Sequence, residues 1–148
     1  MTDPKHLLAV AAADPVAASL AHLKQHPDVT AAFGGPNHVS GLVEAPWPRL
    51  RVTAGPGGNL RALRWDTATE VLLEVIGDPT GWPGSAELRR LTLIAAGALA
   101  QMPDQDGPPD SPVVSRVTPT GPLALTELTV GSYRYSATFE VVLHPRVD

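Results

Sequence analysis

The chain has 148 residues, of which 43% are apolar and 18% are charged, and its formal net charge is −4. This length allows one domain with its own core, and the apolar share excludes an intrinsically disordered chain. Phosphate binding needs clustered Lys and Arg, so the acidic balance argues against a simple nucleic-acid binder. A chain without cysteine has no disulfides, thiolate catalysis or cysteine-based zinc sites.

Neither a membrane span nor a signal peptide is expected. The longest apolar run, residues 91–100, is about half the length of a bilayer-spanning helix. The apolar stretch at residues 7–13 follows Asp3 and Pro4 beside Lys5, so the positively charged start of a signal peptide is missing. We predict a single domain over residues 1–148, in which residues 1–13 form a loosely packed N-terminal segment.

Helix signals dominate the first quarter of the chain. Asp14 is a favourable N-cap, Pro15 suits the first helical turn, and the His26-Pro27 pair ends the predicted helix. Residues 4–13 favour a weaker Ala-rich helix, and a helical turn is predicted over residues 29–33, closed by two glycines. The apolar face of the first clear helix consists of Val16, Leu20 and Leu23.

After residue 38, the spacing of apolar residues changes from that of a helix to the alternation typical of strands. Residues 39–43 form a short predicted strand, and residues 49–54 and 65–76 alternate as the two strands of a long hairpin. The Gly-Pro-Gly-Gly-Asn sequence at residues 55–59 is typical of a turn within an extended connection. In the first hairpin strand, the alternation places Leu50, Val52 and Ala54 inward and Arg49, Arg51 and Thr53 outward.

The second half contains one long helix and two strands. Ser85 is the predicted N-cap of this helix, and Pro103 ends it. Residues 113–118 form a strand, and residues 133–144 alternate between an apolar and a mostly polar face. We therefore predict an α+β fold, with a mainly antiparallel sheet of four to five strands and two amphipathic helices on one face. The apolar stripe of the long helix consists of Leu88, Leu91, Ala95, Ala98, Leu99 and Met102.

Phosphate-binding and catalytic motifs are missing from the sequence. The glycine-rich stretch at residues 55–60 lacks the third glycine and the following helix of a dinucleotide-binding loop. Neither a GxxxxGK[ST] sequence nor a G-x-S-x-G sequence occurs. We expect no enzymatic activity and no cofactor.

Two groups of residues have partial metal-binding patterns. His22 and His26 have the four-residue spacing of a two-His metal pair, but no third ligand accompanies them. Asp104, Asp106 and Asp110 share one loop, but Pro108 and Ser115 stand where an EF-hand has its third acid and its final Glu. A solvated helix face and a solvated loop explain these residues better, so we expect no metal site.

One locally basic stretch contains no acid between Glu44 and Asp66. It is either a solvated strand face or a contact surface for an acidic neighbour, where charge would set orientation and encounter rate. Tryptophan is also favoured at interfaces. The interface candidates are therefore Arg49, Arg51, Arg61, Arg64 and Trp65.

Four stretches together resemble one family of viral structural proteins. The first two are residues 14–33 and the segment Trp47-Pro48-Arg49-Leu50-Arg51-Val52. The third combines residues 71–78 with residues 87–91, and the fourth is the closing strand at residues 133–145. In element order and local character, the chain resembles the tail terminator (tail completion) proteins of long-tailed, siphovirus-type bacteriophages that infect actinobacteria.

This resemblance implies a structural virion protein of the tail or neck that is assembled in the host cytoplasm. Such proteins form a ring, usually a hexamer, that caps the completed tail tube and ends its polymerisation. The implied partners are further copies of the chain, the major tail tube protein and a head-completion (stopper) protein. DNA is expected to pass through the lumen without specific binding.

Three alternatives remain open at the level of sequence. The first is a head–tail connector or stopper protein of the same neck. The second is a small-ligand binding domain, in which Tyr133 and Tyr135 would supply polar groups to a pocket. The third is a small metal-dependent hydrolase that uses His22, His26 and the acidic loop.

Overall fold

Two long antiparallel strands form the centre of the sheet in this protein. The computed structural model describes residues 14–59, 67–104, 113–121, 124–129 and 132–144. The strand order is β1-β2-β3-β6-β4, β5 also pairs with β6, and the pairing is antiparallel except between β1 and β2. The strands are β1 (Val39–Ser40), β2 (Arg49–Asn59), β3 (Thr67–Ile76), β4 (Val113–Pro119), β5 (Ala124–Thr129) and β6 (Ser132–His144).

The ladder between β3 and β6 runs without a break from Thr67 opposite Leu143 to Ile76 opposite Arg134. On the other edge of β6, β4 pairs with residues 139–144 and β5 pairs with residues 132–136. These two strands therefore lie end to end and form one interrupted edge strand of the sheet.

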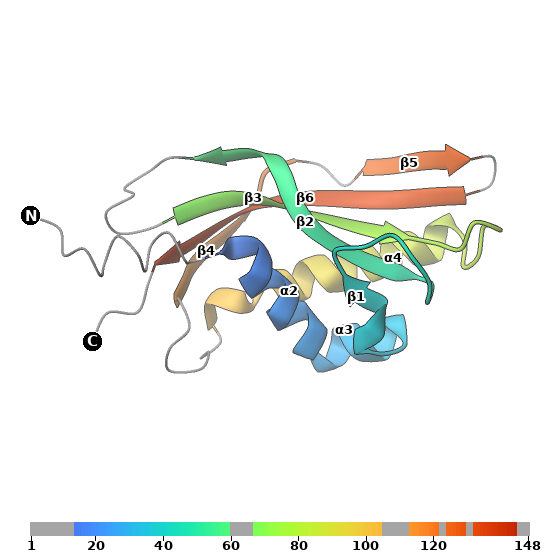
Figure 1. Cartoon of the computed structure of the whole chain (residues 1–148), viewed down its shortest axis with the longest axis horizontal. Helices are drawn as coiled ribbons and strands as arrows, with labels where there is room; N and C mark the ends of the chain where they lie inside the picture. The colour runs from blue at the N-terminus through green and yellow to red at the C-terminus, as the bar shows by residue number, and fades with distance from the viewer. Residues whose placement is uncertain (1–13, 60–66, 105–112, 122–123, 130–131, 145–148) are drawn as a thin grey trace, which may run out of the picture.

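Helices cover one face of the sheet, as Figure 1 shows. They are α2 (Pro15–Gln25), α3 (Pro27–Phe33) and α4 (Ser85–Ala100), with short 3₁₀ turns η1 (Pro36–His38) and η2 (Met102–Asp104). The predicted α+β class, the mainly antiparallel sheet and the helices on one face are confirmed, although the described residues form six strands and three α-helices rather than four to five strands and two helices. The Ala-rich helix predicted over residues 4–13 lies outside the described residues.

Local sequence signals account for the ends of α2 and α3 but for neither end of α4, which stops at Ala100 before the predicted Pro103. The Asp14 carboxylate accepts hydrogen bonds from the backbone N–H groups of Val16 at 2.9 Å and Ala17 at 3.3 Å. At the other end of this region, Gly34 has φ of +105° and terminates α3 in the left-handed conformation that favours glycine. The prediction for Ser85 is wrong, because Gly84 occupies the N-cap position of α4 and no side chain caps this helix.

The core lies between α4, α2, α3 and the covered face of the sheet. All six residues of the predicted α4 stripe are buried, which confirms that prediction. Leu73 on β3 is completely buried and pairs with Val52 on β2 and Ala137 on β6, so their side chains share this covered face. The other fully buried aliphatic residues include Leu23, Leu50, Val71, Val75, Leu91, Leu99, Val141 and Leu143.

The strand predictions need correction at four places. The strand predicted over residues 39–43 is limited to β1, and both Leu42 and Val43 are exposed. The turn predicted at residues 55–59 is instead part of β2, which passes a bulge after Ala54 and pairs again at Gly58 and Asn59. The exposed Ala54 also differs from its predicted inward position. No strand was predicted over residues 124–129, where β5 pairs with β6.

Leu73 provides a test of the core. Replacing this residue with Ala leaves a cavity under α4, so we expect Leu73→Ala to lower the free energy of unfolding by about 2–5 kcal/mol. Leu42 is 58% exposed, and Leu42→Ala should stay within about 0.5 kcal/mol of wild type. Urea denaturation followed by circular dichroism measures both, and equal losses would contradict this assignment of core and surface.

Candidate functional site

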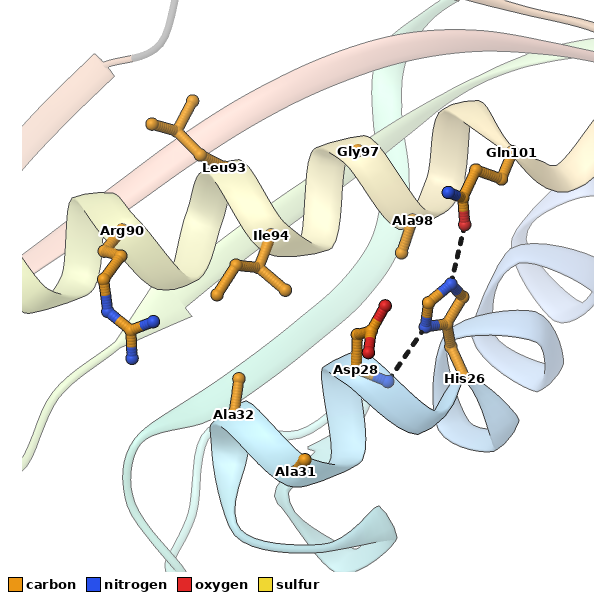
Figure 2. A pocket seen from close by; sticks show the side chains of 10 residues that line it. All are labelled: His26, Asp28, Ala31, Ala32, Arg90, Leu93, Ile94, Gly97, Ala98 and Gln101. Atoms are coloured by element: carbon orange, nitrogen blue, oxygen red, sulfur yellow. Dashed lines mark hydrogen bonds between the residues drawn. The ribbon is translucent and has the colours of Figure 1, made fainter.

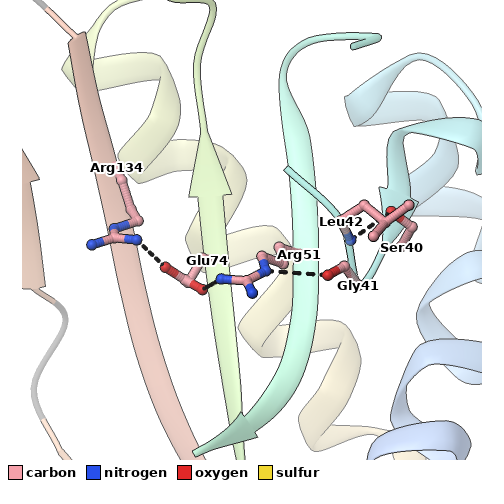
Figure 3. A network of polar contacts seen from close by, with 6 residues as sticks. All are labelled: Ser40, Gly41, Leu42, Arg51, Glu74 and Arg134. Carbon is pink, nitrogen blue, oxygen red and sulfur yellow. Dashed lines mark hydrogen bonds and ion pairs between the residues drawn. The ribbon is translucent and has the colours of Figure 1, made fainter. Parts of the chain in front are cut away.

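The face of the sheet opposite the helices holds an ionic cluster of Arg51, Glu74 and Arg134, called here the Arg–Glu–Arg cluster (Figure 3). Glu74 on β3 lies between Arg51 on β2 and Arg134 on β6. One carboxylate oxygen accepts a hydrogen bond from Arg51 Nη1 at 2.9 Å, and the other accepts one from Arg134 Nη1 at 2.6 Å. The cluster therefore ties together the three central strands.

Glu74 is buried although no described helix covers this face. Its side chain is 4% exposed, whereas those of Arg51 and Arg134 are 33% and 31% exposed. Removing a carboxylate from water is costly unless it is paired, and here each oxygen has its own guanidinium. Two cations and one anion give the cluster a formal charge of +1. Because both arginine side chains are about one-third exposed, this formal positive charge is accessible to an acidic group.

Arg49 lies on the same face of β2 as Arg51, as predicted, but it is buried there rather than exposed to solvent. It is 2% exposed, and its guanidinium donates hydrogen bonds to Ser40 Oγ at 2.6 Å and to the carbonyl of Ala45 at 2.9 Å. A third bond runs from Nε to the carbonyl of Glu44. Arg49 therefore holds residues 40–45 against the start of β2, and its charge faces the chain's own backbone.

The other interface candidates have different outcomes. Arg51 is part of the Arg–Glu–Arg cluster and also donates from Nε to the carbonyl of Gly41 at 3.2 Å. Arg61, Arg64 and Trp65 lie outside the described residues, so their interface role stays a prediction.

The two edges of the sheet are long. On one side, β1 pairs only with Leu50 and Arg51, so residues 52–59 of β2 have no strand beyond them within the described chain. On the other side, no described strand pairs with the outer edge of β4 and β5. Unpaired N–H and C=O groups at such edges can add a strand from another chain. Bulges after Ala54, Val114 and Glu127 divide each edge into shorter regular stretches.

His22 and His26 form hydrogen bonds that connect α2 and the start of α3 to the C-terminal end of α4. The Nε2 group of His22 donates to the carbonyl of Ala98 at 2.7 Å, and that of His26 lies 2.7 Å from Oε1 of Gln101. His26 Nδ1 accepts the backbone N–H of Asp28 at 3.2 Å, so the ring also caps α3. Among the residues with described positions, no group of three potential ligands could hold a metal ion. Asp106 and Asp110 lie outside them.

An open groove of about 600 Å³ lies between α3 and α4 (Figure 2). Small residues of α3 and Ile94 and Ala98 of α4 form its apolar part. Arg90 lies at one end, and Asp28 lies with Gln101 at the other. Small-molecule sites usually enclose their ligand and direct several polar groups at it. This groove is open and its polar groups are separated along its length, which suits a macromolecular surface better.

Two exposed carboxylates have altered acidity. Hydrogen bonds from the backbone N–H and the hydroxyl of Thr80 hold the pKa of Asp78 below its usual range. Hydrogen bonds from Arg90 lower the pKa of Glu87 in the same way. A general acid or base works best with a pKa near the operating pH. The direction of both shifts is therefore opposite to what acid–base catalysis at these groups would need.

Sequence reasoning missed the Arg–Glu–Arg cluster and the groove. Alternation did place Glu74 on the polar face of its strand and Arg134 on the polar face of the last strand. The register that brings them together joins residues 60 positions apart. The groove likewise exists only because α3 lies beside α4, and the residues of one helix alone do not predict this arrangement.

No protein-family model matches the chain, and no curated protein matches it. Within the part of the chain that the structure describes, no helix combines the length and apolarity needed to cross a bilayer.

Glu74 provides a test of the Arg–Glu–Arg cluster. Glu74→Gln leaves two guanidiniums side by side without an anion, so we expect the free energy of unfolding to fall by about 1–3 kcal/mol. Glu87→Gln is the matched control, because this residue also binds an arginine but the pair is exposed. It should unfold close to wild type. Equal stability of the two variants in urea titrations would show that the cluster contributes nothing.

Proposed function

We propose that the chain is a tail terminator protein of a long-tailed bacteriophage. In this function, copies of the chain form a ring on the end of the tail tube, end its polymerisation and join the tail to the head-completion proteins. The finished ring belongs to the virion neck and lets DNA pass. The proposal combines the sequence resemblance with the geometry of the sheet.

The observation that carries the proposal is the pair of different open edges on one sheet. A closed ring with one subunit type needs a head-to-tail interface, in which each copy contributes two different surfaces. The strand order places the β2 edge and the β4–β5 edge on opposite sides of the sheet. The β2 edge of one copy could then meet the β4–β5 edge of the next, with backbone hydrogen bonds between them.

Size and charge are compatible with a DNA conduit. A chain of this length has a radius of gyration of about 15 Å, so it is about 40 Å across. Six such subunits in a ring leave a hole of about 40 Å before loops intrude, whereas duplex DNA is about 20 Å wide. The net charge of −4 disfavours a tight grip on phosphates, which suits passage without binding.

Electron microscopy with purified tail tubes tests the proposal. When the recombinant chain is added to growing tubes, we expect ring-shaped density at one end and arrested elongation. Tubes without the chain, which should keep growing, are the control. Density confined to the head side of the neck would instead make the chain a connector or stopper. Tube ends that stay bare and continue to grow would refute the terminator function.

A further inference from the structure

The exposed side of α4 has a protruding leucine and, one turn further along, a glycine with open space beside it. We call this open space the gap. Exposed residues recur at three- and four-residue spacing along the helix, so they form one stripe opposite its buried side. Within this stripe, Leu93 is 47% exposed. One turn later, a Cβ added at Gly97 would meet nothing within 4 Å. Figure 2 shows both residues on the same side of α4.

Opposite charges lie at the two ends of the same groove. Arg90 bonds to Glu87 through Nε and Nη2, which leaves Nη1 without an acceptor among the described residues. At the other end, no described side chain pairs with the carboxylate of Asp28, which lies near the C-terminal end of α4. Asp28 stands in the first turn of α3, and its carboxylate gives this end of the groove a formal negative charge.

We propose that a second copy of this chain docks in the groove, with the two α4 helices antiparallel. A two-fold axis that runs perpendicular to the helices at the level of Ala95 places Leu93 of each copy opposite Gly97 of the other copy. The same axis brings Arg90 toward the end of α4 that lies beside Asp28 in the other copy. Each copy then contributes one apolar side chain and one cation to the contact, and a two-fold symmetric interface requires such equal contributions.

Self-complementarity is the reason for choosing a second copy over another partner. The protruding Leu93 and the gap at Gly97 lie at equal distances along the helix from Ala95, and so do Arg90 and the last residue of α4. Glycine at the contact also lets two helix backbones approach closely. The groove is formed by helices, whereas the proposed ring uses the edges of the sheet, so this inference does not depend on the proposed ring.

Sedimentation velocity of the full chain over a range of concentrations tests the dimer. Because each copy contributes only one apolar side chain and one cation to the contact, we expect a dissociation constant in the micromolar range. Gly97→Leu fills the gap and should weaken dimerisation at least tenfold. The melting temperature of this variant in dilute solution should equal or exceed that of wild type, because the site is open and glycine is a poor helix former.

Two further comparisons identify the surface. Leu93→Ala should also weaken the dimer at least tenfold, whereas Leu42→Ala, which removes an exposed leucine outside the groove, should leave it unchanged. Asp28→Lys and Arg90→Glu should each weaken self-association. An equimolar mixture of these two variants should dimerise again, because every facing pair in the mixed dimer then has opposite charges.

Three results would overturn the proposal. They are a wild-type chain that stays monomeric up to hundreds of micromolar, a dimer that survives Gly97→Leu, and a mixture of the charge variants that associates no better than either variant alone. Circular dichroism of each variant confirms that it is folded before the comparison is made.

Discussion

The register between β3 and β6 is the constraint on which the other features of this structure depend. Side chains alternate between the two faces of a sheet, so a slip of one residue would exchange the faces of an entire strand. In the observed register, Val71, Leu73 and Val75 lie under the helices while Glu74 lies on the opposite face. A slip would place this carboxylate in the core, where it would have no guanidinium partner.

The ionic and hydrogen-bonded side chains on this face of the sheet connect its own strands and the segment beside them. Arg51 and Arg134 neutralise Glu74 from both sides, and Arg49 ties the segment after β1 to the start of β2. A buried carboxylate or guanidinium needs partners of this kind, because neither group leaves water without compensation. The exposed parts of Arg51 and Arg134 lie on the face that no described helix covers, where they can contribute to recognition as well as to stability.

The two surfaces that we propose for association use different physical interactions. The sheet edges offer unpaired backbone groups and can bind almost any extended segment, so geometry and charge must supply selectivity. The groove beside α4 offers an apolar side chain, a gap and separated charges, which together select one orientation of one partner. The groove is formed by α3 and α4 and the edges by β2, β4 and β5, so the two proposed contacts use different elements of the fold.

The sequence alone determined the features that depend on neighbouring residues. Asp14 and Gly34 mark helix ends through local backbone chemistry, and the stripe of α4 and the alternation of β6 follow from the period of apolar residues. These signals suffice for the α+β class. Only the tertiary structure decided that residues 55–59 extend β2, because pairing with β3 overrides their preference for a turn. The same holds for β5, the burial of Arg49, the partners of Glu74 and the groove, since each joins residues that only the folded backbone brings together.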